Sequence, residues 1–365
     1  MKDNIEYDVV VIGAGIAGMV SAVTANGLGK KVAIIEKRSF GGNCSSYTCL
    51  PSKTLIRAGH ITRLLQNLKY YGLQTSSPLE VDITKLMSHV KVLIAKANDK
   101  DAPETFERIG IKTVIGSAEF RDSHHIVVNG QTIASRCFII ASGTRPLVPP
   151  IKGLQDIKFL TNETLYDLES LPKSMIILGG GVDGLEFASA LGRLGIQVTV
   201  VEMATKLLAS DDRELINSLL EQLQNDGIRI MTGTKASAFF KEGEGIALAI
   251  ELPNGKSSRL EAEGVLLTIG RKADLDGLKL DKAGVKYTPR GITINQKMQT
   301  SVPHIYACGD IAGPIQLAST AEYQGILAAT NALLPLKREA DYTNVAFVIF
   351  TEPALARLGL TEEKV

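Results

Sequence analysis

Two of the four cysteines lie close together in a glycine-rich stretch of the chain. Cys44 and Cys49 stand in the segment GGNCSSYTCLPSK, residues 41–53, with four residues between them. One turn of helix could bring two sulfurs at this spacing within bonding distance, and the pair could then alternate between a disulfide and a dithiol. Cys137 and Cys308 are far along the chain in apolar surroundings, and we interpret them as small core residues.

The cysteine pair has two rival interpretations, an iron–sulfur cluster and a zinc site. The iron–sulfur spacing C-x4-C-x2-C requires a third cysteine at position 52, which is Ser52. A zinc site would need further Cys or His ligands nearby, and the sequence has none there. The five histidines, at positions 60, 89, 124, 125 and 304, are interpreted as surface or packing residues. A redox pair is therefore favoured, and no metal site is expected.

A glycine motif of the form GxGxxG occurs twice, each time after an apolar strand-like run and before a helical pattern. GAGIAG follows YDVVVI, and GGGVDG follows SMIIL. In such turns the first glycine makes the tight turn, the second lets the backbone approach a pyrophosphate, and the third allows close helix packing. The helix N-terminus then holds the phosphates with its free N–H groups. The two sets are Gly13, Gly15 and Gly18, and Gly179, Gly181 and Gly184.

An acidic residue ends the next apolar run about 20 residues after each motif, as dinucleotide binding requires. These residues are Glu36 and Glu202, and each would accept hydrogen bonds from ribose hydroxyls. At Glu202 a carboxylate suits a 2′-hydroxyl and repels a 2′-phosphate, so NAD is favoured over NADP. The nearby Lys206 leaves tolerance of NADP open.

Two βαβ units, which begin about half the chain apart, must position these groups. Each unit is expected to carry a β-meander before its last strand, with hairpins at Asn129-Gly130 and Asn254-Gly255. The sequence thus predicts an α/β fold with two Rossmann-like (three-layer ββα) dinucleotide-binding domains and inserted β-meanders. The expected last strands cover 138–143 and 265–270, and helical patterns cover 54–70 and 83–109.

Bulk composition excludes several kinds of partner. The 365 residues carry 40 basic and 39 acidic side chains without long runs of one sign, which argues against nucleic acid or an anionic membrane surface. The longest apolar stretch, Val9 to Val23, is 15 residues long, which is too short to span a bilayer. No secretory signal pattern precedes it. We expect a cytoplasmic protein.

The segment GGxCxxxxCxPSK beside an FAD-type GxGxxG resembles the active-site helix of the class I pyridine nucleotide-disulfide oxidoreductases. This family includes dihydrolipoamide dehydrogenase, glutathione reductase and mercuric reductase. Three further segments resemble the family's motifs in the same order: FIIASGTRP, VLLTIGRKAD and TSVPHIYACGDIAG. Glu202 and the ending FTEPALARLGLTEEKV are most similar to dihydrolipoamide dehydrogenase.

The resemblance implies a role for individual residues. Cys44 would be the interchange thiol that reacts with substrate, and Cys49 the thiolate held against the flavin. Lys53 would lie near flavin N5 and pair with Glu186, so that these four residues form the catalytic set. The FAD-binding set would be Gly13, Gly15, Gly18, Glu36, Lys37, Gly42, Lys53, Ala118, Gly143, Asp310 and Ala318. The NAD-binding set would be Gly179, Gly181, Gly184, Glu202, Ala236 and Gly270.

The family pattern also implies a division of the chain. The expected parts are an FAD-binding domain over 1–148, an NAD-binding domain over 149–272, a second FAD-binding part over 273–338, and the start of a dimerisation domain over 339–365. That last domain normally supplies a His–Glu pair as acid and base, and none of the five histidines stands in such a context. We therefore expect a truncated chain that dimerises weakly, whereas the full-length form would be a homodimer.

The sequence departs from the family at two places. Between the cysteines stands Ser-Ser-Tyr-Thr, and Val182 with the polar Asp183 follows the second glycine motif. The expected activity is FAD-dependent electron transfer between NAD(H) and a small or protein-bound disulfide, as in dihydrolipoamide dehydrogenase. The alternatives are a reductase of another disulfide such as glutathione disulfide, a mercuric reductase, or a non-catalytic flavin-binding module.

Overall fold

The computed structural model describes residues 5–74, 80–313 and 315–362. The outer ends of the first and last expected domains, at 1–4 and 363–365, lie outside the described residues. By compactness the chain divides into two units. Unit 1 comprises Met1–Ser46, Ala95–Arg145 and Arg271–Tyr342, and unit 2 comprises Tyr47–Ile94, Pro146–Gly270 and Thr343–Val365.

Unit 1 is built on a mixed sheet whose parallel part follows from apolar, β-branched strands. β1 (Tyr7–Ile12) lies between β2 (Val32–Glu36) and β6 (Gln131–Ile140), and all three are parallel. β3 (Lys112–Ile115) extends the sheet beyond β2, and β18 (Ile305–Ala307) extends it beyond β6. β1 and β2 are buried along almost their whole length, as expected for parallel strands covered on both faces.

The first meander is formed by β4 (Glu119–Phe120), β5 (His125–Val128) and the first half of β6. Asn129 and Gly130 have φ of 52° and 77°, and this left-handed pair confirms the predicted hairpin. The last strand, however, is not a separate element beginning at 138. β6 runs unbroken from the meander into the parallel sheet, because no Gly or Pro interrupts residues 131–140.

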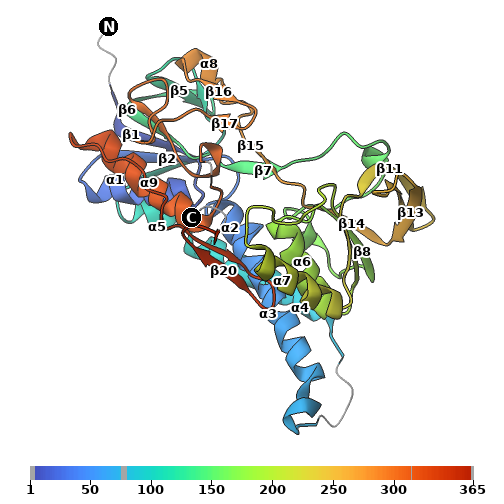
Figure 1. Ribbon diagram of the computed structural model, residues 1–365. Helices are drawn as coiled ribbons and strands as arrows, with labels where there is room; N and C mark the ends of the chain where they lie inside the picture. The colour runs from blue at the N-terminus through green and yellow to red at the C-terminus, as the bar shows by residue number, and fades with distance from the viewer. Residues whose placement is uncertain (1–4, 75–79, 314, 363–365) are drawn as a thin grey trace. The chain divides into compact units, whose positions relative to one another are not determined.

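Helices of unit 1 cover this sheet. α1 (Ile16–Gly27) and α9 (Ala318–Leu333) lie side by side (Figure 1). α1 packs next to β1 and β2, and α9 packs next to β6 and β18. Their close approach requires Gly325, where a Cβ would lie 2.5 Å from the carbonyl oxygen of Ala17. The other elements of unit 1 are α2 (Gly42–Ser46), α5 (Pro103–Glu107), β7 (Thr144–Pro146), β15 (Arg271–Ala273), α8 (Leu280–Ala283), β16 (Tyr287–Thr288), β17 (Gly291–Ile292) and η4 (Gly309–Ile311).

Unit 2 repeats the plan. Its parallel sheet has the order β10 (Arg229–Met231), β9 (Gln197–Val201), β8 (Ser174–Leu178) and β14 (Gly264–Leu267). α6 (Val182–Arg193) connects β8 to β9, which confirms the second βαβ unit.

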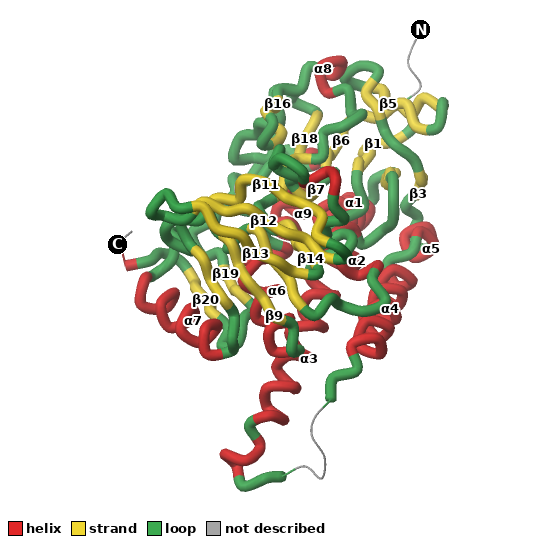
Figure 2. Tube along the Cα trace, turned by 90° about the vertical axis from the view of Figure 1, so that its right-hand side faces the viewer, coloured by secondary structure: helices red, strands yellow, loops and turns green. Residues whose placement is uncertain are grey.

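The second meander forms a sheet of its own. It consists of β11 (Lys235–Glu242), β12 (Gly245–Glu251) and β13 (Ser257–Ala262), which are antiparallel and lie together in Figure 2. Its hairpin at Asn254-Gly255 is present, but only Gly255 has a positive φ, of 76°.

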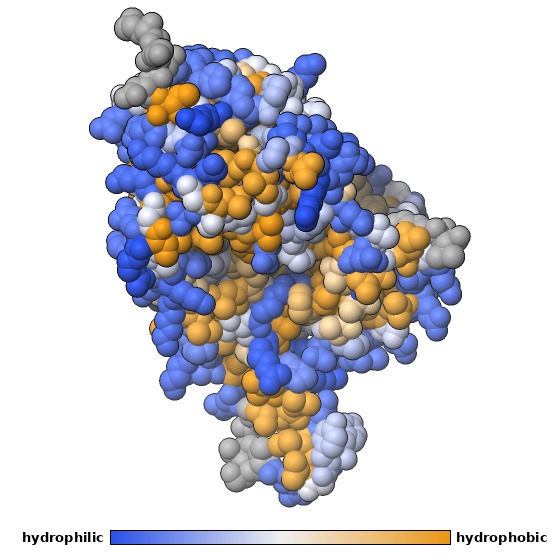
Figure 3. Space-filling view, turned by 90° about the vertical axis from the view of Figure 1, so that its left-hand side faces the viewer, coloured by the Kyte–Doolittle hydropathy of each residue, from blue (hydrophilic) through white to orange (hydrophobic). Residues whose placement is uncertain are grey.

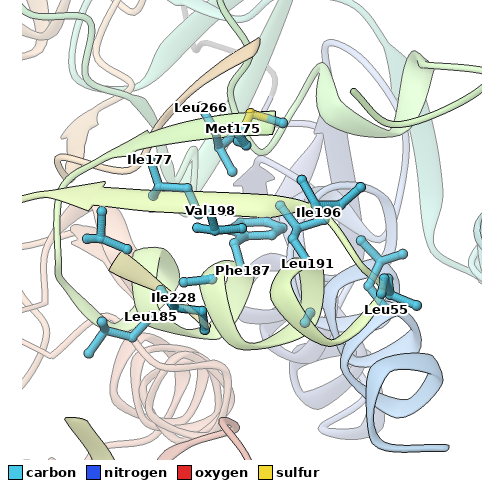
Figure 4. Close-up of a cluster of buried hydrophobic side chains, with 14 of the residues drawn as sticks. Leu55, Met175, Ile177, Leu185, Phe187, Leu191, Ile196, Val198, Ile228 and Leu266 are labelled. Carbon is cyan, nitrogen blue, oxygen red and sulfur yellow. The ribbon is translucent and has the colours of Figure 1, made fainter. Parts of the chain in front are cut away.

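α3 (Cys49–Gln66) joins the core of unit 2 through its first half. Leu55 is fully buried and points into the same cluster as Leu191 of α6 and Ile196 (Figure 4). A Cβ on Gly59 would lie 3.0 Å from the carbonyl oxygen of Ala190, so the glycine permits the close contact of α3 with α6. Toward its end α3 becomes exposed, and apolar surface continues over this part in Figure 3. The exposed apolar side chains there are Ile61, Leu64 and Leu65.

The predicted helix over 83–109 is two helices. α4 (Ile83–Lys100) ends before Pro103, and α5 begins at that proline. Proline lacks the N–H that a helix interior requires but is well suited to the first turn. The helix predicted over 54–70 begins five residues earlier, at Cys49, and gives way to η1 (Leu68–Tyr71).

The remaining elements of unit 2 are short, apart from α7. They are η2 (Leu154–Asp156), η3 (Leu165–Asp167), α7 (Arg213–Asn225), β19 (Ala346–Ile349) and β20 (Leu355–Leu358). Across the described ranges, no helix combines the length and the apolar character needed to cross a bilayer.

Candidate functional site

The first glycine turn has the steric properties that a pyrophosphate cradle needs. Gly13 has φ of +104°, and a Cβ there would lie 2.4 Å from the carbonyl oxygen of Ala141. A Cβ on Gly18 would lie 1.8 Å from the carbonyl oxygen of Gly13, so only glycine fits there. Gly15, in contrast, has no atom within 4 Å of its Cβ position. The middle glycine therefore leaves open space in front of the helix.

The second turn repeats this arrangement. A Cβ on Gly179 would lie 2.6 Å from the carbonyl oxygen of Thr268, and one on Gly184 would lie 2.0 Å from that of Gly179. Gly181 again faces open space. Gly15 and Gly181 are the N-caps of α1 and α6, and neither has a side chain that could cap the first N–H groups. Both helix starts can therefore donate to a phosphate.

Glu36 and Glu202 hold their turns in the same way. Glu36 accepts hydrogen bonds from the backbone N–H of Ala14 and of Arg38, both at 2.7 Å. Glu202 accepts from Gly180 N and Ala204 N, also at 2.7 Å. Each carboxylate thus lies beside its glycine turn at the end of the second strand. A carboxylate oxygen can accept more than one hydrogen bond, so both groups retain capacity for a ribose hydroxyl.

Several of the residues expected to bind FAD meet at the carboxyl edge of the unit 1 sheet. A Cβ on Gly42 would lie 2.7 Å from the Cα of Gly15, so α2 begins directly against the first turn. Thr144, one residue after Gly143, donates from its hydroxyl to Asp310 Oδ2 at 3.2 Å. Asn43 Nδ2 donates to the Thr144 carbonyl at 3.0 Å. Open α/β sheets bind ligands at this edge.

The other expected FAD positions are more scattered. Lys37 forms an ion pair with the buried Asp274 at 2.6 Å, a contact between segments far apart in the sequence. Ala118 is buried just before β4, and Ala318 is the first residue of α9. Lys53 belongs to unit 2, together with the expected NAD positions.

The expected NAD positions other than the glycine turn and Glu202 lie on strands or strand ends of unit 2. Ala236 is half-buried in β11. Gly270 follows β14 with φ of +114°, and its carbonyl accepts from Leu147 N at 3.0 Å. Gly179, Glu202 and Gly270 thus follow β8, β9 and β14, at one edge of the parallel sheet.

The two cysteines do not share one helical turn, contrary to the sequence-based expectation. Cys44 lies in α2 and Cys49 opens α3, with a break at Tyr47 and Thr48, and no disulfide joins the two cysteines. The reason is Pro51, which has no N–H to donate to the carbonyl of Tyr47 four residues earlier. That carbonyl instead accepts a hydrogen bond from Asn162 Nδ2 at 3.3 Å. The proline is accommodated in the first turn of a new helix.

The expected Lys53–Glu186 pair is present between α3 and α6. Lys53 Nζ lies 2.7 Å from Glu186 Oε2, and Glu186 is only 4% exposed. Glu186 Oε1 accepts from the backbone N–H of Phe350 at 2.9 Å. Lys53 Nζ also lies 4.5 Å from the centroid of the Phe350 ring, within the range of a cation–π contact. Phe350 carries no sequence signal for this contact, because it lies about 300 residues from Lys53.

The other two cysteines are not surface thiols. Cys308 is fully buried with its sulfur 3.6 Å from the Ser21 hydroxyl, and burial raises its pKa to about 12. Burial also raises the pKa of the half-buried Cys137. Among the described residues, no group of three or more His, Cys, Asp or Glu side chains could hold a metal ion.

A His–Glu pair does occur in unit 2, but its position does not suit a base for the cysteines. His60 Nδ1 lies 2.5 Å from Glu352 Oε2. His60 is 11 residues after Cys49 on α3, which corresponds to about 16 Å along the helix axis. In unit 1, His125 pairs with Asp122 at 2.8 Å, and the rings of His124 and His304 stack with centroids 4.1 Å apart. These contacts are those of packing residues.

Comparisons with known proteins agree with this geometry. Residues 7–325 match the family model of the pyridine nucleotide-disulphide oxidoreductases. The chain is 35% identical to a mercuric reductase of Staphylococcus aureus, covering 98% of this chain and 65% of that protein. It is 33% identical to a dihydrolipoyl dehydrogenase of Bacillus subtilis, covering 97% of this chain and 77% of that protein.

A solved structure shares the fold over nearly the whole chain. The HOCl-induced flavoprotein disulfide reductase RclA from Escherichia coli matches with a TM-score of 0.87 and 26% identity, covering 98% of this chain and 78% of that one. The chain spans somewhat less than two thirds of the length of the mercuric reductases it matches at 34–35% identity. The protein belongs to the pyridine nucleotide-disulphide oxidoreductase family.

Proposed function

We propose that the protein is an FAD-dependent oxidoreductase that passes electrons between NAD(H) and a dithiol–disulfide substrate through Cys44 and Cys49. The observation that supports this most directly is the pair of matching glycine cradles, at Gly15 and Gly181, in a chain that also carries the cysteine pair. Two cradles can bind two dinucleotides, and a disulfide formed by the two cysteines can accept the electrons.

The residues of each cradle fit the expected cofactor. In unit 1 the open position at Gly15, the carboxylate of Glu36 and Asp310 would hold FAD. In unit 2 Gly181 and Glu202 would hold NAD(H). When bound, the flavin supplies the means to take a hydride from the nicotinamide and deliver electrons to sulfur. The carboxylate of Glu202 disfavours a 2′-phosphate, so we propose a preference for NAD.

The overall reaction in the reducing direction balances without a further reactant. The disulfide and NADH give one thiol, one thiolate and NAD⁺, because the hydride carries two electrons and one proton. Cys44 would then exchange with the substrate disulfide, and Cys49 would retain the charge. The ammonium of Lys53 would favour that thiolate, and Glu186 would hold the ammonium in place through the 2.7 Å ion pair.

We propose a dithiol of the dihydrolipoamide type as the substrate. Mercuric ion is the second candidate, since mercuric reductases are among the relatives at 34–35% identity. The test is the rate of NADH oxidation by one preparation with lipoamide, glutathione disulfide or Hg(II), and with Cys44→Ser as the matched control. Lipoamide turnover that is lost in Cys44→Ser supports the proposal. Turnover of Hg(II) alone would favour the second candidate, and turnover of none would contradict the activity.

A further inference from the structure

A buried carboxylate of unit 1 has one oxygen without a hydrogen-bond partner. Asp274 follows β15 and is 6% exposed. Its Oδ2 forms the 2.6 Å ion pair with Lys37, whereas its Oδ1 is buried and accepts no hydrogen bond from the described residues. Leaving a buried charged oxygen unsatisfied is costly. Only a group that donates an O–H or an N–H could satisfy it.

The contacts of Asp274 place it at the carboxyl end of β1. Its backbone N–H donates to the Gly143 carbonyl at 3.0 Å, and its carbonyl accepts from the Ser142 hydroxyl at 3.0 Å. Both of these residues follow β6, whereas Lys37 follows β2. β1 lies between β6 and β2 in the sheet and ends directly before the first glycine turn. The groups that hold Asp274 therefore lie on both sides of β1, and its carboxylate lies beside that turn.

The same contacts put Asp274 on the side of the cradle that would hold the adenosine half of FAD. Lys37 directly follows Glu36, the residue proposed to bind the ribose. Ala273, one residue before Asp274, belongs to the same core cluster as Ala118, which is expected to contact the adenylate part. Asp274 is thus joined to one of the residues expected at the adenosine half and lies next to another.

The chemistry of FAD limits which of its groups could satisfy Oδ1. The pyrophosphate carries negative charge and offers only oxygen acceptors. The ammonium of Lys37 offsets the charge of Asp274, so that the carboxylate can lie near the phosphates without net repulsion. The adenosine ribose carries 2′- and 3′-hydroxyl groups, and a hydroxyl can donate to a carboxylate. Such a charge-assisted hydrogen bond is about twice as strong as one between neutral groups.

We propose that Asp274 Oδ1 accepts a hydrogen bond from a hydroxyl of the adenosine ribose of FAD, while Oδ2 holds the ammonium of Lys37. Glu36 would approach the ribose from the end of β2, and Asp274 from its attachment to the residues after β6. Each of the two ribose hydroxyls would then have one carboxylate acceptor. This inference rests on the FAD binding of the proposed function, and it adds Asp274 to the residues that hold the cofactor.

The test measures cofactor affinity rather than turnover. The full chain is stripped of flavin, and the dissociation constants of FAD and of its 2′,3′-dideoxyadenosine analogue are measured by flavin fluorescence. Asp274→Ala should weaken FAD binding about tenfold and leave the binding of the analogue unchanged, because the analogue has no ribose hydroxyl to donate. The matched control is Asp276→Ala, which removes the same charge from the same segment. The Asp276 side chain is 69% exposed and pairs with Arg145, so this control should leave both dissociation constants unchanged.

A second variant guards against misfolding of Asp274→Ala. Asp274→Asn keeps the shape of the side chain and an oxygen that can accept, but its hydrogen bond to the ribose would be neutral. It should therefore weaken FAD binding about threefold, again without an effect on the analogue.

Two results would overturn the inference. Unchanged FAD affinity in both variants would show that the ribose does not need the carboxylate. Equal weakening of FAD and of the analogue would show that Asp274 acts through the adenine amino group or through the fold. Failure of the proposed function would look different: the unmodified protein would bind no FAD, or its bound FAD would pass no electrons to Cys44 and Cys49, whatever residue stands at position 274.

Discussion

The Lys53–Glu186 pair allows a prediction in which the two partners are not equivalent. The Glu186 side chain is 5% exposed, whereas that of Lys53 is 36% exposed. Replacing Lys53 by Met leaves a buried carboxylate that keeps the hydrogen bond from Phe350 N. Replacing Glu186 by Gln leaves an ammonium that can turn to water, while the amide oxygen can still accept from Phe350 N. The first change should therefore destabilise the protein more than the second.

The magnitudes follow from the exposed fractions. Breaking a buried ion pair costs about 3–5 kcal/mol, and the remaining bond from Phe350 N places Lys53→Met near the lower value, about 3 kcal/mol. Glu186→Gln should cost only about 1 kcal/mol, since the ammonium is more than a third exposed and is screened by solvent. The double variant Lys53→Met with Glu186→Gln leaves no unpaired charge. It should be about 2 kcal/mol more stable than Lys53→Met alone.

Urea unfolding followed by far-UV circular dichroism measures these differences, because the chain contains no tryptophan. Because the chain has two units, it can unfold in more than one transition. The free energies to compare are those of the transition whose midpoint changes when Lys53 or Glu186 is replaced. Lys85→Met is the matched control: its ion pair with Asp82 is exposed, at 86% and 52%, and solvent screens it, so its loss should leave the stability unchanged. If Glu186→Gln were as damaging as Lys53→Met, or if the double variant were the least stable, the reasoning from burial would be refuted.

Three further predictions concern other parts of the molecule. Glu202→Arg should lower kcat/KM with NADH and raise it with NADPH; equal use of both cofactors by the unmodified protein would contradict this. Gly18→Ala should abolish the yellow, FAD-containing form, since the new Cβ would lie 1.8 Å from the Gly13 carbonyl oxygen. Gly27→Ala, which meets no atom within 4 Å, should retain the yellow form, and equal FAD content in both variants would be inconsistent with a steric requirement at Gly18. Because burial raises the pKa of Cys308 from 9.0 to about 12, the buried thiol contributes stability below pH 9 that is lost as the pH rises toward 12. Between pH 9 and pH 12 the free energy of unfolding of Cys308→Ala should therefore fall less than that of the unmodified protein. Parallel curves of unfolding free energy against pH would show that the thiol does not contribute.

The parts of the site that sequence could predict are those set by local sterics. The two glycine turns were predicted from spacing alone, because a tight turn and a close helix each restrict the residue type. The positions of Glu36 and Glu202 beside these turns were predicted from the same spacing. The break between Cys44 and Cys49 could have been anticipated from Pro51, whose missing N–H disfavours a continuous helix through this segment. The remaining error in predicting α3 concerned its ends, because the sequence pattern locates a helix better than it locates its first and last residues.

Contacts between segments far apart in the chain could not be predicted from the sequence. Asn162 is more than 100 residues from Tyr47, and nothing in its own segment marks it as the donor to the Tyr47 carbonyl. Phe350 reaches Glu186 through its backbone N–H, which any residue could supply. β6 gives a second example. Its sequence pattern indicates a strand, but it does not show that one strand pairs first with β5 in the meander and then with β1 in the parallel part of the sheet.

In the proposed reaction, Cys44 and Cys49 accept electrons from NADH by way of the flavin. Anaerobic titration of the FAD-loaded protein with a reductant, followed by absorbance, counts the electrons that the protein takes up. Full reduction should consume four electrons per FAD in the unmodified protein and two in Cys44→Ser, because the disulfide takes the additional pair. Two electrons per FAD in both proteins would show that the cysteine pair is inert and that the proposed electron transfer does not occur.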